Sequence, residues 1–260
     1  MLEVRGICKS IRGNMVVRNV DLDVGAGQVV GLLGENGAGK TTCFRMVCGL
    51  IPADAGRVTL GGHDVTRWPM YLRSLKGGMG YLPQESSIFR KLTVRDNLLA
   101  VMELLGFDAR ERKRRCAELL ARFGLENHAG KMAMVLSGGL KRRLEIARAL
   151  VSNPRIILLD EPFVGIDPGT VLEIQKIIRE LRKQKISFLI TDHNVDETVE
   201  IADRIYLLAK GEVACSGEPD YVRHHPCEAA RCYFVERPAS NKQAETTSGV
   251  DGKIGSGGGM

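Results

Sequence analysis

A glycine-rich loop between an apolar run and a helical pattern constrains this chain more than any other feature. The apolar run, Gln-Val-Val-Gly-Leu-Leu, covers residues 28–33, and the helical pattern covers about 40–50. A short apolar run of this kind is typical of a strand that is buried on both faces of a parallel sheet. The loop therefore predicts a strand-to-helix turn at the edge of an α/β sheet.

The loop carries residue types that suit phosphate groups. Its residues are Gly34, Glu35, Asn36, Gly37, Ala38, Gly39, Lys40, Thr41 and Thr42. Glycines allow backbone N–H groups to turn inward, and the N-terminus of the next helix adds the positive end of its dipole. At this spacing the lysine reaches the β- and γ-phosphates, and the threonine hydroxyl coordinates Mg²⁺. We therefore predict a P-loop with Lys40 and Thr41 in these roles.

A second apolar run, at 156–159, ends in the carboxylates Asp160 and Glu161. If this run is a strand beside the P-loop strand, Asp160 can hold Mg²⁺ through its water shell, and Glu161 can polarise an attacking water. Acidic residues also end strands simply because the strand meets solvent there. The neighbouring P-loop favours the catalytic interpretation.

Ser137, Gly138 and Gly139 precede an amphipathic helical pattern at 141–150. This is a second helix start suited to phosphate, although Ser137 could equally be a helix cap and nothing more. One nucleotide does not need two such sites in one subunit. We therefore expect the second site to serve the nucleotide held by another copy of the chain.

The order of the motifs resembles that of the ABC ATPase family over about residues 2–237. The P-loop is followed by Tyr-Leu-Pro-Gln at 81–84, Leu-Ser-Gly-Gly at 136–139, Asp-Glu at 160–161 and Asp-His at 192–193. A P-loop alone is shared by many folds, but this ordered set is specific.

The resemblance implies roles for several of these residues. Gln84 would contact Mg²⁺ and sense the transport partner, Asp167 would be the D-loop aspartate, and His193 would contact the γ-phosphate as a catalytic residue. Ser137, Gly138 and Gly139 would bind the γ-phosphate of ATP held by the opposite subunit. ATP and Mg²⁺ are the implied cofactors, and a head-to-tail dimer around ATP is the implied active form.

Two residues depart from the family pattern. Leu140 stands where the signature usually has glutamine, so a polar contact to the partner's nucleotide is lost, while the serine and glycine contacts remain. Ile11 stands where an aromatic residue usually stacks on adenine. We expect adenine to pack on Ile11 with weaker base selectivity, and we still expect hydrolysis.

The expected fold is an α/β P-loop ATPase core with a mostly parallel sheet and, by resemblance, an N-terminal antiparallel β part. The chain has 260 residues, 44% of them hydrophobic, which suits one large domain. Apolar residues at helical spacing predict an inserted helical subdomain at about 86–151. Residues 238–260 are rich in Ser, Gly, Thr and Lys and predict a disordered tail.

No run of 18 apolar residues occurs, and Glu3 and Arg5 interrupt the N-terminus where a signal peptide needs an apolar segment. We therefore expect a cytoplasmic chain that reaches a membrane only by docking. The net charge of +6 fits nucleotide, a membrane surface or nucleic acid, and discriminates poorly among them.

The seven cysteines form no C-x-x-C pair and are odd in number, which favours free thiols. The stretch His224, His225, Pro226 and Cys227 could bind metal. A solvated turn is the favoured interpretation, because no second pair of ligands lies nearby in the sequence.

Three stretches, at 81–94, 159–168 and 190–198, resemble the lipopolysaccharide-export branch of the family. This implies an ATPase on the cytoplasmic face of the inner membrane that serves two integral-membrane subunits without touching the cargo. Residues 86–92 would line the groove for those subunits, with Phe89 as an apolar anchor and Arg90 on its rim. The alternative for Phe89 is a core residue of the helical insert.

Two other functions remain open. ATPases of branched-chain amino-acid importers share the nucleotide chemistry and a similar D-loop. Soluble ABC ATPases that act on nucleic acid or ribosomes usually carry two nucleotide cassettes, whereas this chain has one P-loop and one Leu-Ser-Gly-Gly. We therefore expect no nucleic-acid partner.

Overall fold

The computed structural model describes residues 1–193 and 195–235, and its centre is a mostly parallel sheet. The strand order is β10-β9-β3-β8-β7-β6, with β10 alone antiparallel to its neighbour. These strands are β3 (Val29–Gly34), β6 (Met79–Leu82), β7 (Ile156–Asp160), β8 (Ser187–Thr191), β9 (Arg204–Ala209) and β10 (Glu212–Gly217). Every residue of β3, β7 and β8 is buried, as is typical of central strands in a parallel sheet that is covered on both faces.

An antiparallel sheet near the N-terminus has the order β2-β1-β4-β5. Its strands are β1 (Leu2–Ile11), β2 (Asn14–Val24), β4 (Ala55–Leu60) and β5 (His63–Asp64). The expected N-terminal antiparallel β part is thus confirmed. The sequence pattern at 2–11 did not predict β1. The pairing of β1 with β2 and with β4 contains register shifts, and these interrupt the alternation of buried and exposed residues that marks a strand.

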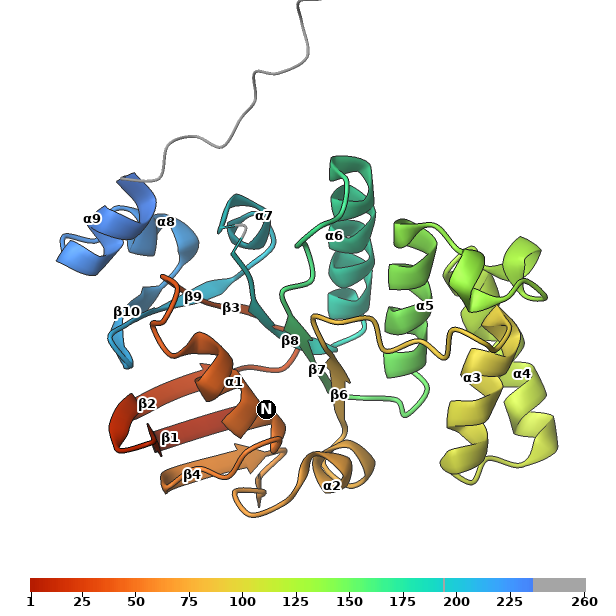
Figure 1. Ribbon diagram of the computed structural model, residues 1–260, viewed down its shortest axis with the longest axis horizontal. Helices are drawn as coiled ribbons and strands as arrows, with labels where there is room; N and C mark the ends of the chain where they lie inside the picture. The colour runs from red at the N-terminus through yellow and green to blue at the C-terminus, as the bar shows by residue number, and fades with distance from the viewer. Residues whose placement is uncertain (194, 236–260) are drawn as a thin grey trace, which may run out of the picture.

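The helix that follows the P-loop, α1 (Lys40–Cys48), packs between the two sheets (Figure 1). Its buried face belongs to a core shared with β1, β2, β3 and β7. On the other side of the main sheet, α6 (Pro168–Lys183) contributes to a second core together with the helical part of the molecule. The short helices α2 (Met70–Leu75) and α7 (Val195–Val199) flank these layers.

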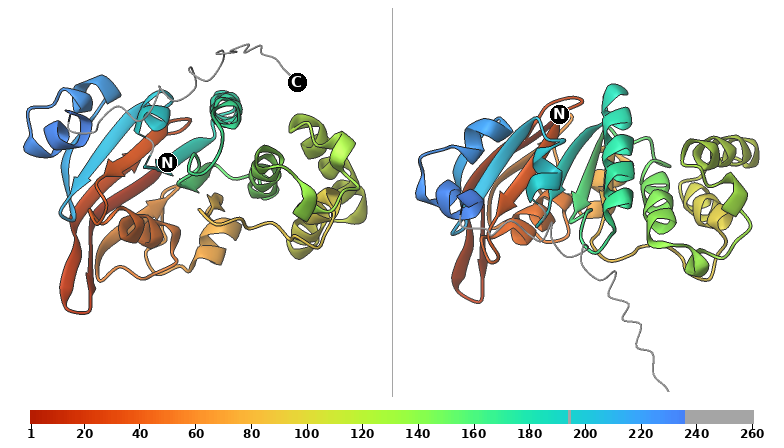
Figure 2. Two further views of the ribbon diagram at one scale, coloured as in Figure 1. Left: turned by 45° about the horizontal axis from the view of Figure 1, so that its top comes forward. Right: turned by 90° about the horizontal axis from the view of Figure 1, so that it is seen from above.

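The helical part extends to one side of the sheets in all three views (Figures 1 and 2). It contains α3 (Val94–Leu104), α4 (Ala109–Arg122), two short 3-10 turns (Glu126–His128 and Ala133–Val135) and α5 (Gly138–Ala149). Within the predicted helical stretch, α3 begins at Val94 because the Thr93 side chain accepts a hydrogen bond from Asp96 N at 3.0 Å and caps the helix.

Two short helices, α8 (Pro219–Arg223) and α9 (Glu228–Val235), cover β9 and β10 at the opposite end of the molecule (Figures 1 and 2). The tail predicted at 238–260 lies outside the described residues. Within the described part of the chain, no helix has both the length and the apolar character needed to cross a membrane.

Candidate nucleotide site

The loop at 34–39 joins β3 to α1 in a backbone conformation that needs glycine at two positions. At Gly34 a Cβ would lie 2.3 Å from Leu208 O, and at Gly39, where φ is +99°, a Cβ would lie 2.7 Å from Val16 O. Gly37 also has positive φ, but a Cβ there would meet no atom within 4 Å, so this part of the loop faces open space. The loop can therefore present backbone N–H groups to an anion.

Lys40 places its ammonium inside this loop. Its Nζ donates to Gly34 O at 2.6 Å and to Glu35 O at 2.8 Å, and the side chain is buried. No side chain caps the first turn of α1, so the helix start that bears Thr41 and Thr42 is open to an oxygen-rich ligand. A buried cation beside a glycine cradle fits the phosphates of a nucleotide.

The carboxyl ends of β7 and β8 bring the predicted acidic residues beside each other. Asp160 ends β7, is buried, and accepts a hydrogen bond from Thr191 Oγ1 at 2.8 Å across the parallel pair. One oxygen of Asp160 is thus held by the protein. Oxygen ligands of this kind suit Mg²⁺, so the donor set fits the ion predicted from the sequence.

Glu161 lies where three of the predicted site residues meet. Its Oε2 accepts from Gln84 Nε2 at 2.7 Å, and its Oε1 lies 2.6 Å from His193 Nε2. Its backbone has a φ of +48° and is held by Glu161 N donating to Thr191 O at 2.7 Å. A non-glycine residue in this conformation is costly and persists only where its surroundings hold it. The structure thus brings Gln84, Glu161 and His193 together although they are far apart in the sequence.

The Ser137 start of α5 is built separately from the P-loop. Ser137 caps α5, although its hydroxyl accepts from Leu140 N at a long 3.4 Å. The buried residues of α5 belong to the core of the helical part, whereas those of α1 belong to the core between the sheets. Leu140 packs against the helical core, which explains an apolar residue at this position. The two predicted phosphate-binding helix starts are therefore supported by different parts of the chain.

Asp167 has a local structural role in addition to the one predicted for it. It caps α6, accepting from Thr170 N at 3.0 Å and from Thr170 Oγ1 at 2.6 Å. These hydrogen bonds from Thr170 hold the pKa of Asp167 below its usual value. Gly139 lies against the same threonine, because a Cβ there would lie 2.9 Å from Thr170 Oγ1. Thr170, in the first turn of α6, therefore packs against Gly139 in the first turn of α5.

A buried ion pair on α5 connects this helix to the segment that follows Gln84. Arg142 Nη1 lies 3.0 Å from Glu145 Oε2, and Glu145 Oε1 accepts from Ser86 Oγ at 2.6 Å and from Ser87 N at 3.2 Å. The sequence analysis missed these residues, because charges at positions 142 and 145 look like an ordinary solvated helix face. Their only sequence signal is a charged pair three residues apart.

We expect Glu145→Ala to lower the free energy of unfolding by about 3–5 kcal/mol, because it leaves the Arg142 charge buried without its partner. The control is Glu118→Ala, which breaks the exposed i,i+4 pair with Arg114 and should cost about 1 kcal/mol or less. Urea denaturation of each variant measures its loss in free energy of unfolding. If both variants lost only about 1 kcal/mol or less, Arg142 and Glu145 would not form a buried ion pair.

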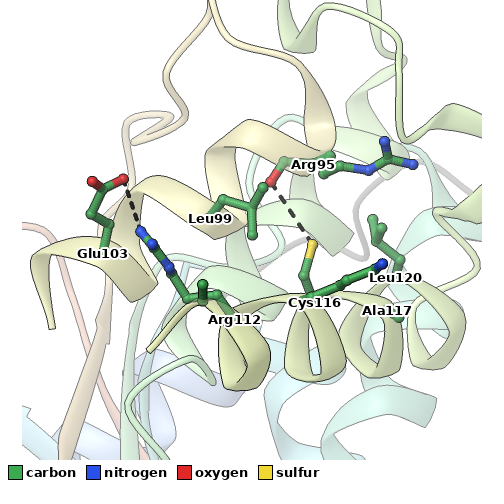
Figure 3. Close-up of a pocket in the computed structure, with 9 residues that line it drawn as sticks. Arg95, Leu99, Glu103, Arg112, Cys116, Ala117 and Leu120 are labelled. Carbon is green, nitrogen blue, oxygen red and sulfur yellow. Dashed lines mark hydrogen bonds and ion pairs between the residues drawn. The ribbon is translucent and has the colours of Figure 1, made fainter. Parts of the chain in front are cut away.

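The molecule has one hollow in its helical part and another beside the P-loop. One, of about 610 Å³, runs between α3 and α4 and is lined by Leu99, Cys116 and Leu120, with the Glu103–Arg112 ion pair at its edge (Figure 3). Its largely apolar wall offers no glycine loop for phosphate. A smaller hollow of about 330 Å³ has residues 35–38 of the P-loop on one side and α9 on the other.

Comparison with known proteins agrees with this geometry. The family model described as ABC transporter matches residues 17–164, which include the P-loop, the Ser137 helix start and the Asp160–Glu161 pair. The chain belongs to the ABC transporter family. This ABC ATPase has the fold expected from the sequence, and ATP binding and hydrolysis are the activity of its family.

Several curated relatives span nearly the whole of this ABC ATPase. It is 47% identical to the lipopolysaccharide export system ATP-binding protein LptB of Escherichia coli, over 84% of this chain and 90% of LptB. It is 49% identical to LptB of Acidithiobacillus ferridurans, over 87% and 93% of the two chains. It is also 49% identical to an uncharacterized ABC transporter ATP-binding protein of Rhizobium meliloti, over 90% and 86%.

A solved structure supports the fold of this ABC ATPase. The ADP conformation of MJ1267, an ATP-binding cassette of an ABC transporter, superposes with a TM-score of 0.80 at 27% identity. The alignment covers 90% of this chain and 98% of that one.

Proposed function

We propose that the chain is the Mg²⁺-dependent ATPase subunit of a transporter that extracts lipopolysaccharide from the inner membrane and exports it toward the outer membrane. The observation that supports lipopolysaccharide as the cargo is the identity of 44–49% to proteins named LptB, over most of each chain. The ATPase domain extends over residues 2–237, with its helical insert at about 86–151. The chain sits peripherally on the cytoplasmic face and does not touch the cargo.

Two copies act together in this proposal. The P-loop helix α1 and the Ser137 helix α5 pack into different cores of one chain, so each helix start has its own support and can contribute to a different nucleotide. A head-to-tail pair places Ser137, Gly138 and Gly139 of one copy on the γ-phosphate held by the P-loop of the other. The packing of the two helix starts in different cores is the observation that supports the proposed dimer.

The residues that would hold Mg²⁺ are Thr41 at the start of α1, Asp160 at the end of β7 and Gln84. Bound there, Mg²⁺ neutralises charge on the β- and γ-phosphates. Lys40 contributes a second positive charge to the same phosphates, and the glycine loop contributes N–H donors. The chain's part in catalysis is thus largely positioning and charge stabilisation.

Glu161 is the proposed general base, and in the single chain both of its carboxylate oxygens are engaged, by Gln84 and His193. These contacts leave it poorly placed to orient a water. Dimer closure around ATP would engage His193 with the nucleotide and Gln84 with the site that would hold Mg²⁺, so that Glu161 would be free to accept a proton from the attacking water. Hydrolysis therefore depends on the second copy.

Ile11 and Asp167 complete the proposed nucleotide contacts. Ile11 ends β1 with 43% of its surface exposed, so it is free to pack against a base. An aliphatic contact of this kind lacks the geometry of aromatic stacking and discriminates bases weakly. Asp167 lies at the N-terminus of α6, where it can face the second copy while it caps the helix.

The segment at 86–92 is the proposed docking groove for the two membrane subunits. Phe89 is 41% exposed, and the Arg148 guanidinium lies 4.4 Å from the centre of its ring. Asn97, which is fully buried, holds the backbone of Phe89 with hydrogen bonds of 2.8 and 3.0 Å. A rigid, exposed aromatic beside exposed Arg90 suits an apolar anchor with a basic rim.

We expect Phe89→Ala to weaken association with the membrane subunits roughly 30-fold or more, because a central aromatic anchor contributes about 2 kcal/mol or more. ATP hydrolysis by the isolated chain should change little. The measurement is co-purification from detergent-solubilised inner membranes. The control is Tyr71→Ala, which removes an aromatic ring on α2 that is 60% exposed.

The same co-purification tests the cargo assignment. Recovery of lipopolysaccharide-transport membrane subunits supports it. Recovery of importer subunits with a periplasmic amino-acid-binding protein would replace it with the branched-chain amino-acid importer. Salt-sensitive binding to RNA or DNA in place of either would revive the nucleic-acid alternative.

A further inference from the structure

The fold brings two thiols and an imidazole together near the C-terminal end of the described chain, and none of the three belongs to the predicted nucleotide site. Cys215, His225 and Cys227 offer ligand atoms that all lie within 4.8 Å of one another. No second pair of ligands lies near 224–227 in the sequence, which favours a solvated turn there. In the structure, β10 supplies Cys215 from outside this stretch.

Cys215 reaches this position because β10 is irregular. The register between β10 and β9 shifts between Val213 and Cys215, which places Cys215 opposite Leu207. A shift of this kind turns the side chains that follow it toward a new face. Cys215 is buried in the small core that β9 and β10 share with α8 and α9, and the partly buried Cys227 packs against the same core.

The two thiols interact directly. Burial, followed by the contact with the Cys227 thiol, raises the pKa of Cys215 to about 12. Both cysteines are free rather than joined in a disulfide. With the His225 ring, the two sulfurs lie within 4.8 Å of one another, a separation that allows all three groups to bind one metal ion.

The turn between α8 and α9 orients the other two groups. Cys227 immediately precedes α9, and its carbonyl accepts from Ala230 N at 3.1 Å, so the first turn of α9 fixes the backbone that carries this thiol. His225 Nδ1 accepts from Cys227 N at 3.2 Å, which holds the imidazole beside the two thiols. The edge-on contact with Tyr221, at 5.2 Å between ring centres, limits the orientation of the imidazole.

We propose that Cys215, His225 and Cys227 form a binding site for one Zn²⁺ ion. Two thiolates and one imidazole are a ligand set that zinc uses with a fourth, open position, and thiolates disfavour Mg²⁺. Binding displaces the thiol protons, forms two Zn–S bonds and one Zn–N bond, and changes no oxidation state. The ion would join β10 to the turn before α9, whose residues Glu228, Ala229, Cys232 and Tyr233 form one wall of the hollow behind the P-loop.

The test is metal titration of the full chain, without nucleotide, after treatment with a chelator and a phosphine reductant. Co²⁺, used as a spectroscopic probe, should bind with thiolate charge-transfer bands, and Zn²⁺ should displace it at one equivalent per chain. Cys227→Ser and His225→Asn should each weaken binding by more than about 100-fold, since even outer-shell changes cost about 10- to 100-fold. Cys8→Ser is the control, because Cys8 is a partly buried free thiol on β1 outside the cluster.

Three results would overturn the proposal. The first is a folded chain that shows no thiolate band with Co²⁺. The second is binding that survives in Cys227→Ser and His225→Asn. The third is a reduced chain that takes up no metal but forms a Cys215–Cys227 disulfide in air, which would assign the pair to redox chemistry instead. Circular dichroism of the two variants confirms that loss of metal is not loss of fold, and Cys227 and His225 are chosen because both are only partly buried.

Discussion

Replacing Glu161 with glutamine should lower ATP turnover by about 10²- to 10⁴-fold while leaving ATP binding intact, because the amide keeps the shape of the side chain but cannot accept a proton. The structure already shows that this side chain is held by neighbours through hydrogen bonds that glutamine can partly retain. Without hydrolysis the closed dimer should persist. The measurements are phosphate release at saturating ATP and the dimer fraction by size-exclusion chromatography.

Glu85→Gln is the matched control for this prediction. It makes the same chemical change at an exposed carboxylate next to Gln84, and it should leave turnover close to normal. If Glu161→Gln hydrolyses ATP at the unmodified rate, Glu161 is not the base. Loss of turnover without a persistent dimer would point instead to failed nucleotide binding, which a fluorescent ATP analogue would detect.

Mixing two inactive variants should restore activity if each nucleotide is shared by two copies. Lys40→Ala removes the P-loop cation, and Gly138→Asp places a negative charge at the start of α5. Gly138 is suited to this change because a Cβ there meets no atom within 4 Å in its own chain, so the fold should tolerate it. A charge there would repel the phosphates held by the other copy.

Each variant alone should be almost inactive, and an equal mixture should recover roughly a quarter of normal activity, since half of the symmetric dimers become mixed and each mixed dimer has one intact site of two. The intact site combines the P-loop of the Gly138→Asp copy with the Ser137 helix of the Lys40→Ala copy. Steady-state ATPase rates across mixing ratios measure this. Mixed dimers that form, as native mass spectrometry would show, but stay inactive would refute a site shared in this way.

The local features of this protein were readable from its sequence. The P-loop is one continuous stretch, from a strand buried on both faces to an open helix start, so its glycines and Lys40 identify it without distant partners. The helix start at Ser137 is local for the same reason. The strand β1 was missed because its register shifts break the alternation that marks a strand.

The meeting points of distant residues were decided only by the tertiary structure. Parallel strand order brings Asp160 beside Thr191 and carries Glu161 to Gln84 and His193. The link from Glu145 to Ser86 depends on how α5 packs against the segment after β6.

The sequence favoured a solvated turn at 224–227, because no second pair of ligands lies nearby in the sequence. Cys215, the third ligand of the proposed site, comes from β10, and no local sequence pattern indicates that this strand will face the turn. The sequence therefore determined the phosphate-binding elements, because each is set by neighbouring residues along one stretch of chain. The tertiary structure decided which side chains share a site, because that follows from strand order, register and packing between distant elements.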